Sequence, residues 1–588
     1  MRKLAFLFLS LFAFCTASAQ VTTSSMSGRV ADTDGQPIIG ATIVAVHTPT
    51  GTQYATASTR NGQFNLGGMR VGGPYDVEVS FIGCNTEKIE GIYLTIGEEA
   101  TLDFVLREDS QSIGEVVVVG KANPVFNANR TGAQEVVTLE MMEKLPTTSR
   151  SLDEFVKLTP MSSGKNFAGT SYRFNNVTVD GASFNNSFGL SSALGAQGTE
   201  PISLESIEQV QVMIAPYDVR NGGFTGGGIN SVTNEWHASA YMYTKSPELQ
   251  GRRVRDYVGQ VSEFSNRQYG VSLSGPIVKN KLFFFVNGEL DRQDEPISNR
   301  LADSRVSAAD LDDLAKFLGD QFNYNPGGYD LSKTETRADR LTARIDWNIN
   351  DRNTFSLKYY YLKSYNTNAP STSGAPANGR GPNAYAMPFS SSYYRTNNDF
   401  NIVMADWNST INDHMSNTLK VGYSRLRDYR DMDGGFFPQV DILKDGSSYT
   451  VFGTEANSYN NQLDTDIFQI QDNFTMNYGR HQITVGTQSD YRSFSNGFAQ
   501  NYPGSWVFSS IDDFKFNVLA AKDYMASHGN MTGFDITKYD PSQFGLKGVV
   551  NGGLANSAGT GQTHYLQKYS LMEGFPFAEI DVLQLGFY

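Results

Sequence analysis

The side chains that could carry out chemistry are few in this chain, and they are widely scattered. The six histidines stand at positions 47, 237, 414, 481, 528 and 564, and no pair of them has the spacing of metal ligands. The sequence contains no Gly-x-Ser-x-Gly nucleophile elbow and no Walker phosphate loop. We therefore predict no catalytic residue, no bound metal and no cofactor, and we expect that the protein is not an enzyme.

A glycine cluster is the one segment whose composition could suggest phosphate binding. Gly222, Gly223, Gly226, Gly227 and Gly228 lie close together. A phosphate loop also needs a following Lys-Ser or Lys-Thr pair and a helix whose N-terminus faces the phosphate. Neither follows the cluster. A tight turn before a strand is therefore the better interpretation.

The first residues have the composition of a secretory signal. Arg2 and Lys3 precede an apolar run at 4–14, and small residues at 17–19 supply a cleavage site. We expect residues 1–19 to be removed, which leaves a single cysteine and no internal disulfide. The whole chain has 47 basic and 61 acidic side chains, a formal net charge of −14. An acidic chain of this kind is a poor partner for nucleic acid.

The second half of the chain is dominated by strands in which apolar and polar residues alternate. One face of the first clear hairpin includes Ile345, Trp347, Leu357 and Tyr359, and the other includes Arg344, Asp346 and Lys358. Such alternation suits a transmembrane β-barrel, with the apolar face toward lipid and the polar face toward a wet lumen. From this register we expect an arginine at Leu357 to be costly and an arginine at Ser356 to be nearly silent.

Four such hairpins are predicted, each with a tight turn, and long loops join them. The turns lie at 278–281, 350–353, 412–414 and 478–480, and the loops run through about 294–339, 365–397 and 430–464. Short turns on one side and long loops on the other are typical of a barrel with two distinct ends. The sequence therefore predicts an antiparallel transmembrane β-barrel over 236–588. The alternative is a large soluble β-sandwich or solenoid.

Upstream of the hairpins, the pattern divides into three parts. Residues 20–108 read as a β-sandwich of short strands, with Asn61-Gly62 as a hairpin turn. Residues 109–120 read as a linker that ends in Glu115 and four valines, Val116, Val117, Val118 and Val119. Residues 121–235 read as mixed α/β, and the fold class is mainly β overall. Predicted helices here lie at 139–145 and 151–158, and predicted strands at 174–179, 207–214 and 229–233.

Several short motifs, in their order along the chain, resemble a known family. The motifs of the N-terminal part resemble a carboxypeptidase-regulatory-like domain; they are Gly28-Arg29-Val30, Asp34-Gly35, Gly40-Ala41, Asn61-Gly62 and Tyr75-Asp76-Val77. Those of the middle part resemble the plug of a TonB-dependent outer-membrane receptor; they are Val179-Asp180-Gly181, Ile207-Glu208-Gln209-Val210, the glycine cluster and Ile229-Asn230-Ser231-Val232-Thr233. The closest subfamily looks like the Oar-like or SusC-like receptors of Bacteroidetes.

The resemblance implies a transporter of the cell outer membrane. It would import a bulky nutrient, an oligosaccharide or a peptide, with energy delivered by TonB, ExbB and ExbD. Its other partners would be outer-membrane lipid, the extracellular substrate and a surface lipoprotein. The segment Glu115–Val119 is the candidate TonB box, because extended branched residues suit strand addition. The alternative is that these valines form only the first strand of the plug.

Two other interpretations of the whole chain stay open. One is a surface adhesion or assembly protein that uses a barrel without active transport. The other is a non-functional fragment, because ten or eleven strands can be predicted after residue 236 and plugged outer-membrane transporters have about 22. We expect part of a longer receptor; a complete, smaller barrel is the alternative.

Overall fold

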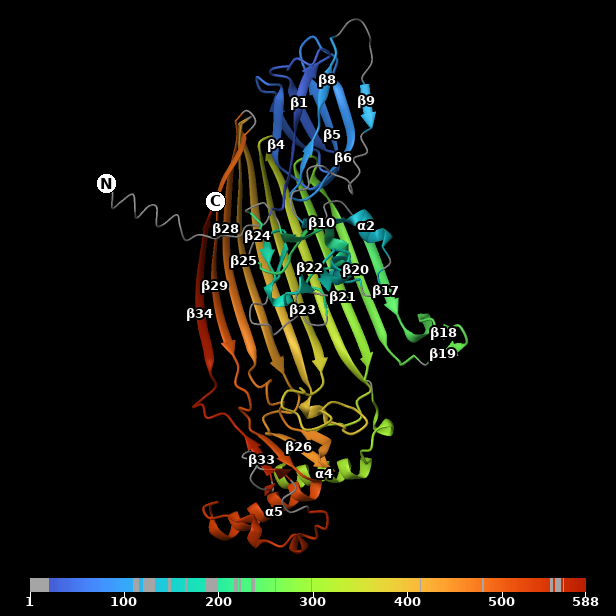
Figure 1. Ribbon diagram of the computed structural model, residues 1–588, viewed down its shortest axis with the longest axis vertical. Helices are drawn as coiled ribbons and strands as arrows, with labels where there is room; N and C mark the ends of the chain where they lie inside the picture. Colours follow the sequence, from blue (N-terminus) through green and yellow to red (C-terminus); the bar gives the residue numbers. More distant parts are fainter. Residues whose placement is uncertain are drawn as a thin grey trace, which may run out of the picture.

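The computed structural model describes residues 21–588, apart from a set of short segments. These are 109–115, 120–132, 146, 148, 149, 164, 165, 186–198, 216–219, 222, 223, 234–237, 260, 298, 413, 479, 480, 550–553, 556–561 and 564. The predicted signal, Glu115 and most of the predicted linker lie outside the described residues. The N-terminal sandwich stands at one end of a large sheet, the plug lies against that sheet, and the long loops gather at the other end (Figure 1).

The N-terminal sandwich consists of two sheets packed face to face. One sheet has the order β4-β1-β7, with β8 also beside β1, and the other has the order β3-β2-β5-β6-β9. Their apolar inner faces form one core, with Tyr75 and Phe104 among its largest fully buried side chains. The strands are β1 (Ser24–Asp32), β2 (Thr42–His47), β3 (Thr52–Ala57), β4 (Gln63–Met69), β5 (Gly72–Ser80), β6 (Glu87–Leu94), β7 (Glu99–Thr101), β8 (Phe104–Leu106) and β9 (Val116–Val119).

The turn at Asn61-Gly62 is real, but the predicted hairpin is wrong. Strand β3 pairs with β2, and β4 pairs with β1 in the other sheet. The chain therefore crosses between the two layers at this turn. Gly62 has φ +74°, and a Cβ there would lie 2.4 Å from the carbonyl oxygen of Val30, so the crossing requires glycine.

The plug is built on a mixed five-stranded sheet with the order β10-β15-β16-β13-β14. The predicted helices and strands all appear, with boundaries shifted by at most two residues. Asp180, which follows β13, has φ +50° and makes a turn with Gly181. The elements are β10 (Ala133–Thr138), α2 (Leu139–Lys144), α3 (Leu152–Val156), β11 (Ser162–Ser163), β12 (Asn166–Phe167), β13 (Asn176–Val179), β14 (Ala182–Ser183), β15 (Ile207–Ala215) and β16 (Gly228–Thr233).

The large sheet has ten strands in the order β17-β20-β21-β22-β23-β24-β25-β28-β29-β34, and all neighbours are antiparallel. The four predicted hairpins are confirmed. In this order of described strands, β17 and β34 stand at the two edges, so the sheet does not close. The strands are β17 (Ala238–Lys245), β20 (Ser265–Val278), β21 (Leu282–Pro296), β22 (Lys333–Asn350), β23 (Asn353–Asn368), β24 (Tyr394–Asn412), β25 (Met415–Asp431), β28 (Gln462–Tyr478), β29 (His481–Gly497) and β34 (Phe577–Phe587).

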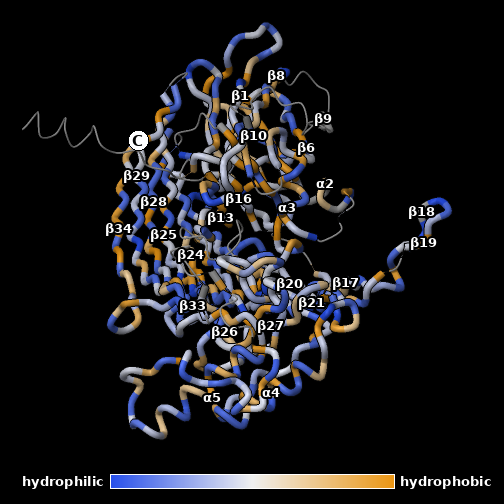
Figure 2. Tube along the Cα trace, turned by 60° about the horizontal axis from the view of Figure 1, so that its bottom comes forward, coloured by the Kyte–Doolittle hydropathy of each residue, from blue (hydrophilic) through white to orange (hydrophobic). Residues whose placement is uncertain are grey.

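The two faces of this sheet differ as predicted, but the side chains of the polar face are less exposed to solvent than expected. Ile345 and Leu357 pair across β22 and β23, and both are more than 40% exposed on the outer face. Arg344 and Lys358 pair beside them on the other face, and both are at most 6% exposed. Figure 2 shows the alternation of apolar and polar residues along the strands. The plug covers the polar face, so these charges are buried against protein and do not line a wet lumen.

The long loops are more ordered than the sequence suggests. A four-stranded sheet with the order β27-β26-β30-β33 packs with two helices over a core that contains Phe389, Phe452 and Phe514. Ser510 caps the N-terminus of α5 by accepting from the Asp513 N–H at 3.0 Å. The elements are α4 (Ala308–Phe322), β26 (Gln439–Lys444), β27 (Ser447–Phe452), β30 (Ser505–Phe508), α5 (Ile511–His528) and β33 (Tyr565–Lys568). Short pairs elsewhere are β18 (Arg253–Val254) with β19 (Tyr257–Val258) and β31 (Leu554–Ala555) with β32 (Gln562–Thr563).

Within the residues that the structure describes, no helix has both the length and the apolarity needed to cross a bilayer.

Candidate functional site

The candidate TonB box is the first part of the site, and its four valines form strand β9. Val116–Val119 run parallel to β6, with Glu87 opposite Val116 and Glu90 opposite Val119. This strand belongs to the sheet of the N-terminal sandwich. The sheet of the plug begins with β10 in its own order, which contradicts the alternative that the valines are the first strand of the plug.

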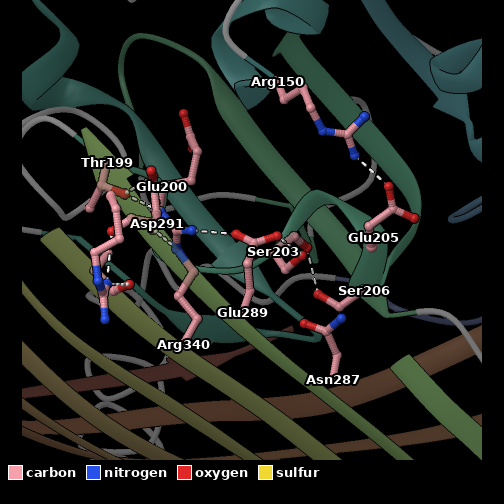
Figure 3. Close-up of polar contacts among 12 residues, drawn as sticks. Arg150, Thr199, Glu200, Ser203, Glu205, Ser206, Asn287, Glu289, Asp291 and Arg340 are labelled. Atoms are coloured by element: carbon pink, nitrogen blue, oxygen red, sulfur yellow. Dashed lines mark hydrogen bonds and ion pairs between the residues drawn. The ribbon is translucent and has the colours of Figure 1, made fainter. Parts of the chain in front are cut away.

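A buried ion cluster joins the plug to the large sheet (Figure 3). Arg340 on β22 pairs with Glu289 and, at 3.2 Å, with Asp291, both on β21. The side chains of these three residues are at most 6% exposed. From the plug, the Glu200 carbonyl accepts from Arg340 Nε and the Ser203 hydroxyl donates to Glu289, each at 2.7 Å. Because buried charges are stable only when fully partnered, moving the plug requires new partners for this cluster.

A second contact lies beside this cluster, between the plug and strand β17. Arg150 forms an ion pair with Glu205, and its guanidinium stacks 3.7 Å from the centroid of the Tyr243 ring. The neighbouring Tyr241 hydroxyl donates to Glu289 at 2.8 Å. The two tyrosines thus connect the first strand of the large sheet to the plug and to the ion cluster.

Asp180 is the centre of a second buried cluster between the plug and the large sheet. Its carboxylate accepts from the Thr233 hydroxyl at 2.7 Å and from the Tyr360 hydroxyl, and Lys358 lies 3.6 Å away. Burial raises the pKa of Asp180, but the charges of Lys358 and Arg344 and these hydrogen bonds outweigh burial and hold the pKa below its usual value. Asp180 therefore stays ionised at neutral pH and fixes the plug turn to the sheet.

Asp346 links the large sheet to the N-terminal sandwich. It accepts from Arg344 at 2.9 Å on its own strand and pairs with Arg70 of the sandwich at 3.2 Å. The Ser356 hydroxyl on the next strand also donates to it, at 2.5 Å. Arg344 in turn donates to the Thr233 carbonyl of the plug at 3.2 Å. The three units of the chain therefore meet around the buried Arg344–Asp346 pair.

The first described residues are also buried between the plug and the sheet. Asn230 of the plug donates to the Val21 carbonyl at 2.8 Å. The ammonium of Lys420, on β25, donates to the Thr22 hydroxyl. Val21 and Thr22 are 6% and 9% exposed. The start of the sandwich is thus held inside the assembly.

Two glutamines of plug strand β15 bind the backbone of the sandwich. Gln209 accepts from the Ile96 N–H at 3.0 Å and donates to the Leu94 carbonyl at 2.9 Å. Gln211 donates to the Ile96 carbonyl at 3.2 Å. Leu94 is the last residue of β6, the strand that pairs with β9. The residues that contact the plug therefore lie at the end of β6 and directly after it.

At the opposite end of the molecule, the loops form an open apolar cavity of about 560 Å³. Aromatic side chains dominate its lining, with Trp506 and Phe508 stacked 6.3 Å apart and Tyr565 beside them. Asn517 and Lys522 provide polar atoms at its edge. Such a lining can bind the apolar face of a ligand or stack on a flat ring.

Sequence reasoning alone found β9 and the charged face of the sheet, but not the clusters that join the units. The predicted lumen-facing residues Arg344, Asp346 and Lys358 all belong to these clusters. Charged residues at every second position of one strand were the available signal. Their partners, such as Arg70 and Asp180, lie in connections far away in the sequence, and no local pattern identifies them.

Comparisons with known proteins agree with this architecture. Residues 25–107 match the carboxypeptidase regulatory-like domain, and residues 229–312 and 296–530 match the outer membrane beta barrel domain. The TonB-dependent transporter Oar of Myxococcus xanthus is 25% identical over 276 residues, which are 42% of this chain and 25% of the transporter. The TonB-dependent receptor SusC of Bacteroides thetaiotaomicron is 31% identical over 175 residues, which are 30% of this chain and 14% of the receptor.

The solved structures that match part of this chain include the outer membrane transporter YddB from Escherichia coli. It aligns with a TM-score of 0.45 at 14% identity, over 64% of this chain and 50% of that chain. The siderophore receptor PirA from Acinetobacter baumannii aligns with a TM-score of 0.42 at 18% identity, over 62% and 48%. The matches thus span a quarter or less of the curated relatives and about half of the solved chains.

Proposed function

Because this chain belongs to the outer membrane β-barrel family, among TonB-dependent receptors of the Oar-like and SusC-like type, we propose that it imports a bulky nutrient across the outer membrane with energy from the inner membrane. The protein is located in the outer membrane. In this proposal residues 1–19 direct secretion, 20–108 form the regulatory-like sandwich, 109–120 form the linker, 121–235 form the plug and 236–588 belong to the barrel.

The observation that carries the proposal is the plug fixed against the inner face of the barrel sheet. Asp180, Arg340 and Asp346 each sit in a buried cluster that contains atoms of both plug and sheet. Solute can pass only when some of these contacts exchange. Breaking a buried ion pair requires much free energy, since the loss of one partner destabilises the protein by about 3–5 kcal/mol. An external source of work is therefore needed, and in this family that source is TonB with ExbB and ExbD.

In this proposal, TonB binds Glu115–Val119 and applies force there. A periplasmic partner can add a strand to an extended segment through main-chain hydrogen bonds. Strand β9 lies at the end of the molecule that carries the short turns, next to the sandwich (Figure 1). The short turns of outer-membrane barrels face the periplasm, where TonB acts.

The loop end faces the outside of the cell in the same orientation and would bind the substrate. Its aromatic cavity of about 560 Å³ suits an apolar side chain of a peptide or the face of a sugar ring. The substrate class we propose is therefore an oligosaccharide or a peptide. A surface lipoprotein that delivers the substrate to the loops is part of the same proposal.

Energy dependence of uptake tests the proposal. Cells that express the full protein are given fluorescent maltoheptaose or labelled tryptic peptides of casein, with and without a functional TonB. We expect accumulation of at least one probe in cells with TonB, and loss of at least 90% of it without TonB. A strain that lacks this protein controls for other routes.

The competing function is a surface adhesion or assembly protein. Surface binding by such a protein would be equal with and without TonB, and the probe would stay accessible to external protease or glycosidase. That outcome would reject the importer.

A further inference from the structure

Strand β9 occupies an unusual place for a segment that a partner must reach. It is the last strand in the order β3-β2-β5-β6-β9, parallel to β6 over four residue pairs. The intervening strands β7 and β8 belong to the other sheet of the sandwich, so the chain crosses over the sandwich before it returns to β6. The sandwich thus holds the segment in a defined extended conformation.

A strand has two edges, and β6 occupies one edge of β9. On the other edge the described part of the chain places no strand. Figure 1 shows β9 at the outer margin of the sandwich, with β6 between it and the rest of the sheet. The backbone donors and acceptors of such an edge are a template for another strand.

The sequence of β9 lacks the features that normally protect an edge. Natural edges carry Lys, Pro, a bulge or a covering element. Val116–Val119 contain neither a charge nor a proline, and the pairing with β6 has no register shift. An unprotected edge of β-branched residues favours addition of a partner strand.

We propose that the N-terminal sandwich presents Val116–Val119 as a ready-made edge strand, and that the periplasmic partner adds its own strand to the outer edge while β9 stays on β6. The inference rests on the proposed function, in which that partner is TonB. Because the segment is already extended, less conformational entropy is lost on binding. The proposal gives the sandwich a defined role: it orders the segment that TonB binds.

The same arrangement connects the docking edge to the plug. Strand β6 ends at Leu94, and the Leu94 and Ile96 backbones are bound by Gln209 and Gln211 of plug strand β15. A partner strand on β9 would therefore be two strands away from the plug contacts. Force on β9 would reach the plug through the sandwich as well as through the linker.

A reversible disulfide between β6 and β9 tests the proposal on the full-length protein. In a Cys84→Ser background, Lys88→Cys and Val117→Cys place thiols on residues that are opposite in register. Neighbouring strands lie about 4.8 Å apart, within the range of Cα separations that a disulfide bridges. Tyr93→Cys with Val117→Cys is the matched control, because Tyr93 lies five residues further along β6, roughly 16 Å away.

Two measurements are made on each oxidised and reduced protein, purified in detergent. Mass spectrometry after alkylation gives the disulfide yield, and biolayer interferometry gives the Kd for the purified periplasmic domain of TonB. We expect a high yield for Lys88→Cys/Val117→Cys, a low yield for the control pair, and oxidised binding within threefold of reduced binding.

Three outcomes overturn the proposal. Equal, low yields in both pairs show that β9 does not rest on β6. A tenfold or greater loss of TonB binding on oxidation, restored by reductant, shows that β9 must leave β6 before TonB binds. Binding by neither form rejects the proposed TonB contact itself, and the disulfide yield then separates that failure from failure of the β6–β9 pairing.

Discussion

At the scale of single residues, the alternation along each strand decides which substitutions the barrel tolerates. Leu357 is 41% exposed on the outer face, whereas Ser356 is 7% exposed and donates to Asp346. The expectation that an arginine at Ser356 would be nearly silent is therefore wrong, because that position is buried and its hydroxyl binds Asp346. The position where charge should be tolerated lies on the outer face near a turn.

Leu357→Arg should destabilise the barrel by about 2–4 kcal/mol, because the guanidinium would lie within the apolar band. Asn353→Arg, on the same face at the start of the strand, should cost about 0–1 kcal/mol, since interfacial water and headgroups can solvate it. Guanidinium unfolding from phosphatidylcholine vesicles gives both values. Equal values for the two variants would contradict the assignment of the lipid-facing side.

Asp180 predicts a specific dependence of stability on pH. The pKa of Asp180 is lower in the folded protein than in the unfolded chain, where it is about 3.9. The ionised side chain therefore stabilises the fold at pH values above the unfolded pKa. This stabilisation is lost as the pH falls through the folded pKa. Asp180→Asn should cost about 1–3 kcal/mol at pH 7 and much less near pH 3. Urea unfolding at both pH values measures this.

The control for the pH experiment is Asp351→Asn, at an exposed position in the tight turn after β22. This variant should follow the wild type at both pH values. A penalty for Asp180→Asn that is the same at pH 3 and pH 7 would show that the Asp180 carboxylate does not stabilise the plug through its charge.

At the scale of elements, the buried Arg70–Asp346 ion pair is one of the contacts between the sandwich and the large sheet. Arg70→Ala removes one partner of Asp346 but leaves Arg344 and Ser356 in place. We expect a loss of about 1–3 kcal/mol and faster hydrogen exchange at Leu94–Ile96, where the sandwich meets the plug. Arg60→Ala, at an exposed turn of the same sandwich, is the matched control.

Exchange measured by mass spectrometry distinguishes the outcomes. If the hydrogen-exchange rates at Leu94–Ile96 are equal in Arg70→Ala and Arg60→Ala, the ion pair does not hold the sandwich in place.

Elements with a strong local signal could be predicted from the sequence, and their packing could not. The turn at 350–353 could be predicted because short polar side chains such as Asn bind the backbone two residues further on. In the structure, Asn350 accepts from the Arg352 N–H. Helix α4 was missed, although Leu311, Leu314 and Leu318 are all fully buried and have helical spacing. The Gln209–Leu94 contact joins residues 115 positions apart, and no local pattern encodes it.

At the scale of the whole molecule, the sandwich, plug and sheet form one connected body, joined by the contacts of Asp346, Arg340 and Gln209. The signal for this organisation was the order of the motifs, which the family matches confirm for the regulatory-like and barrel regions. The buried clusters around Asp180, Arg340 and Asp346 could not be foreseen, because each combines atoms from two or three units. Their existence explains why the polar face of the sheet is dry.

Direct binding of TonB to the linker strand is the measurement that tests the central claim most directly. Full-length protein and its Val117→Pro variant are compared by biolayer interferometry with the purified periplasmic domain of TonB. Proline removes a backbone donor and fixes φ, so we expect at least a tenfold loss of affinity in Val117→Pro while heat-modifiable migration of the barrel is unchanged. Ser112→Pro, earlier in the same linker, should bind like the wild type. Equal TonB binding by the wild type and Val117→Pro would contradict the account, as would no binding by either.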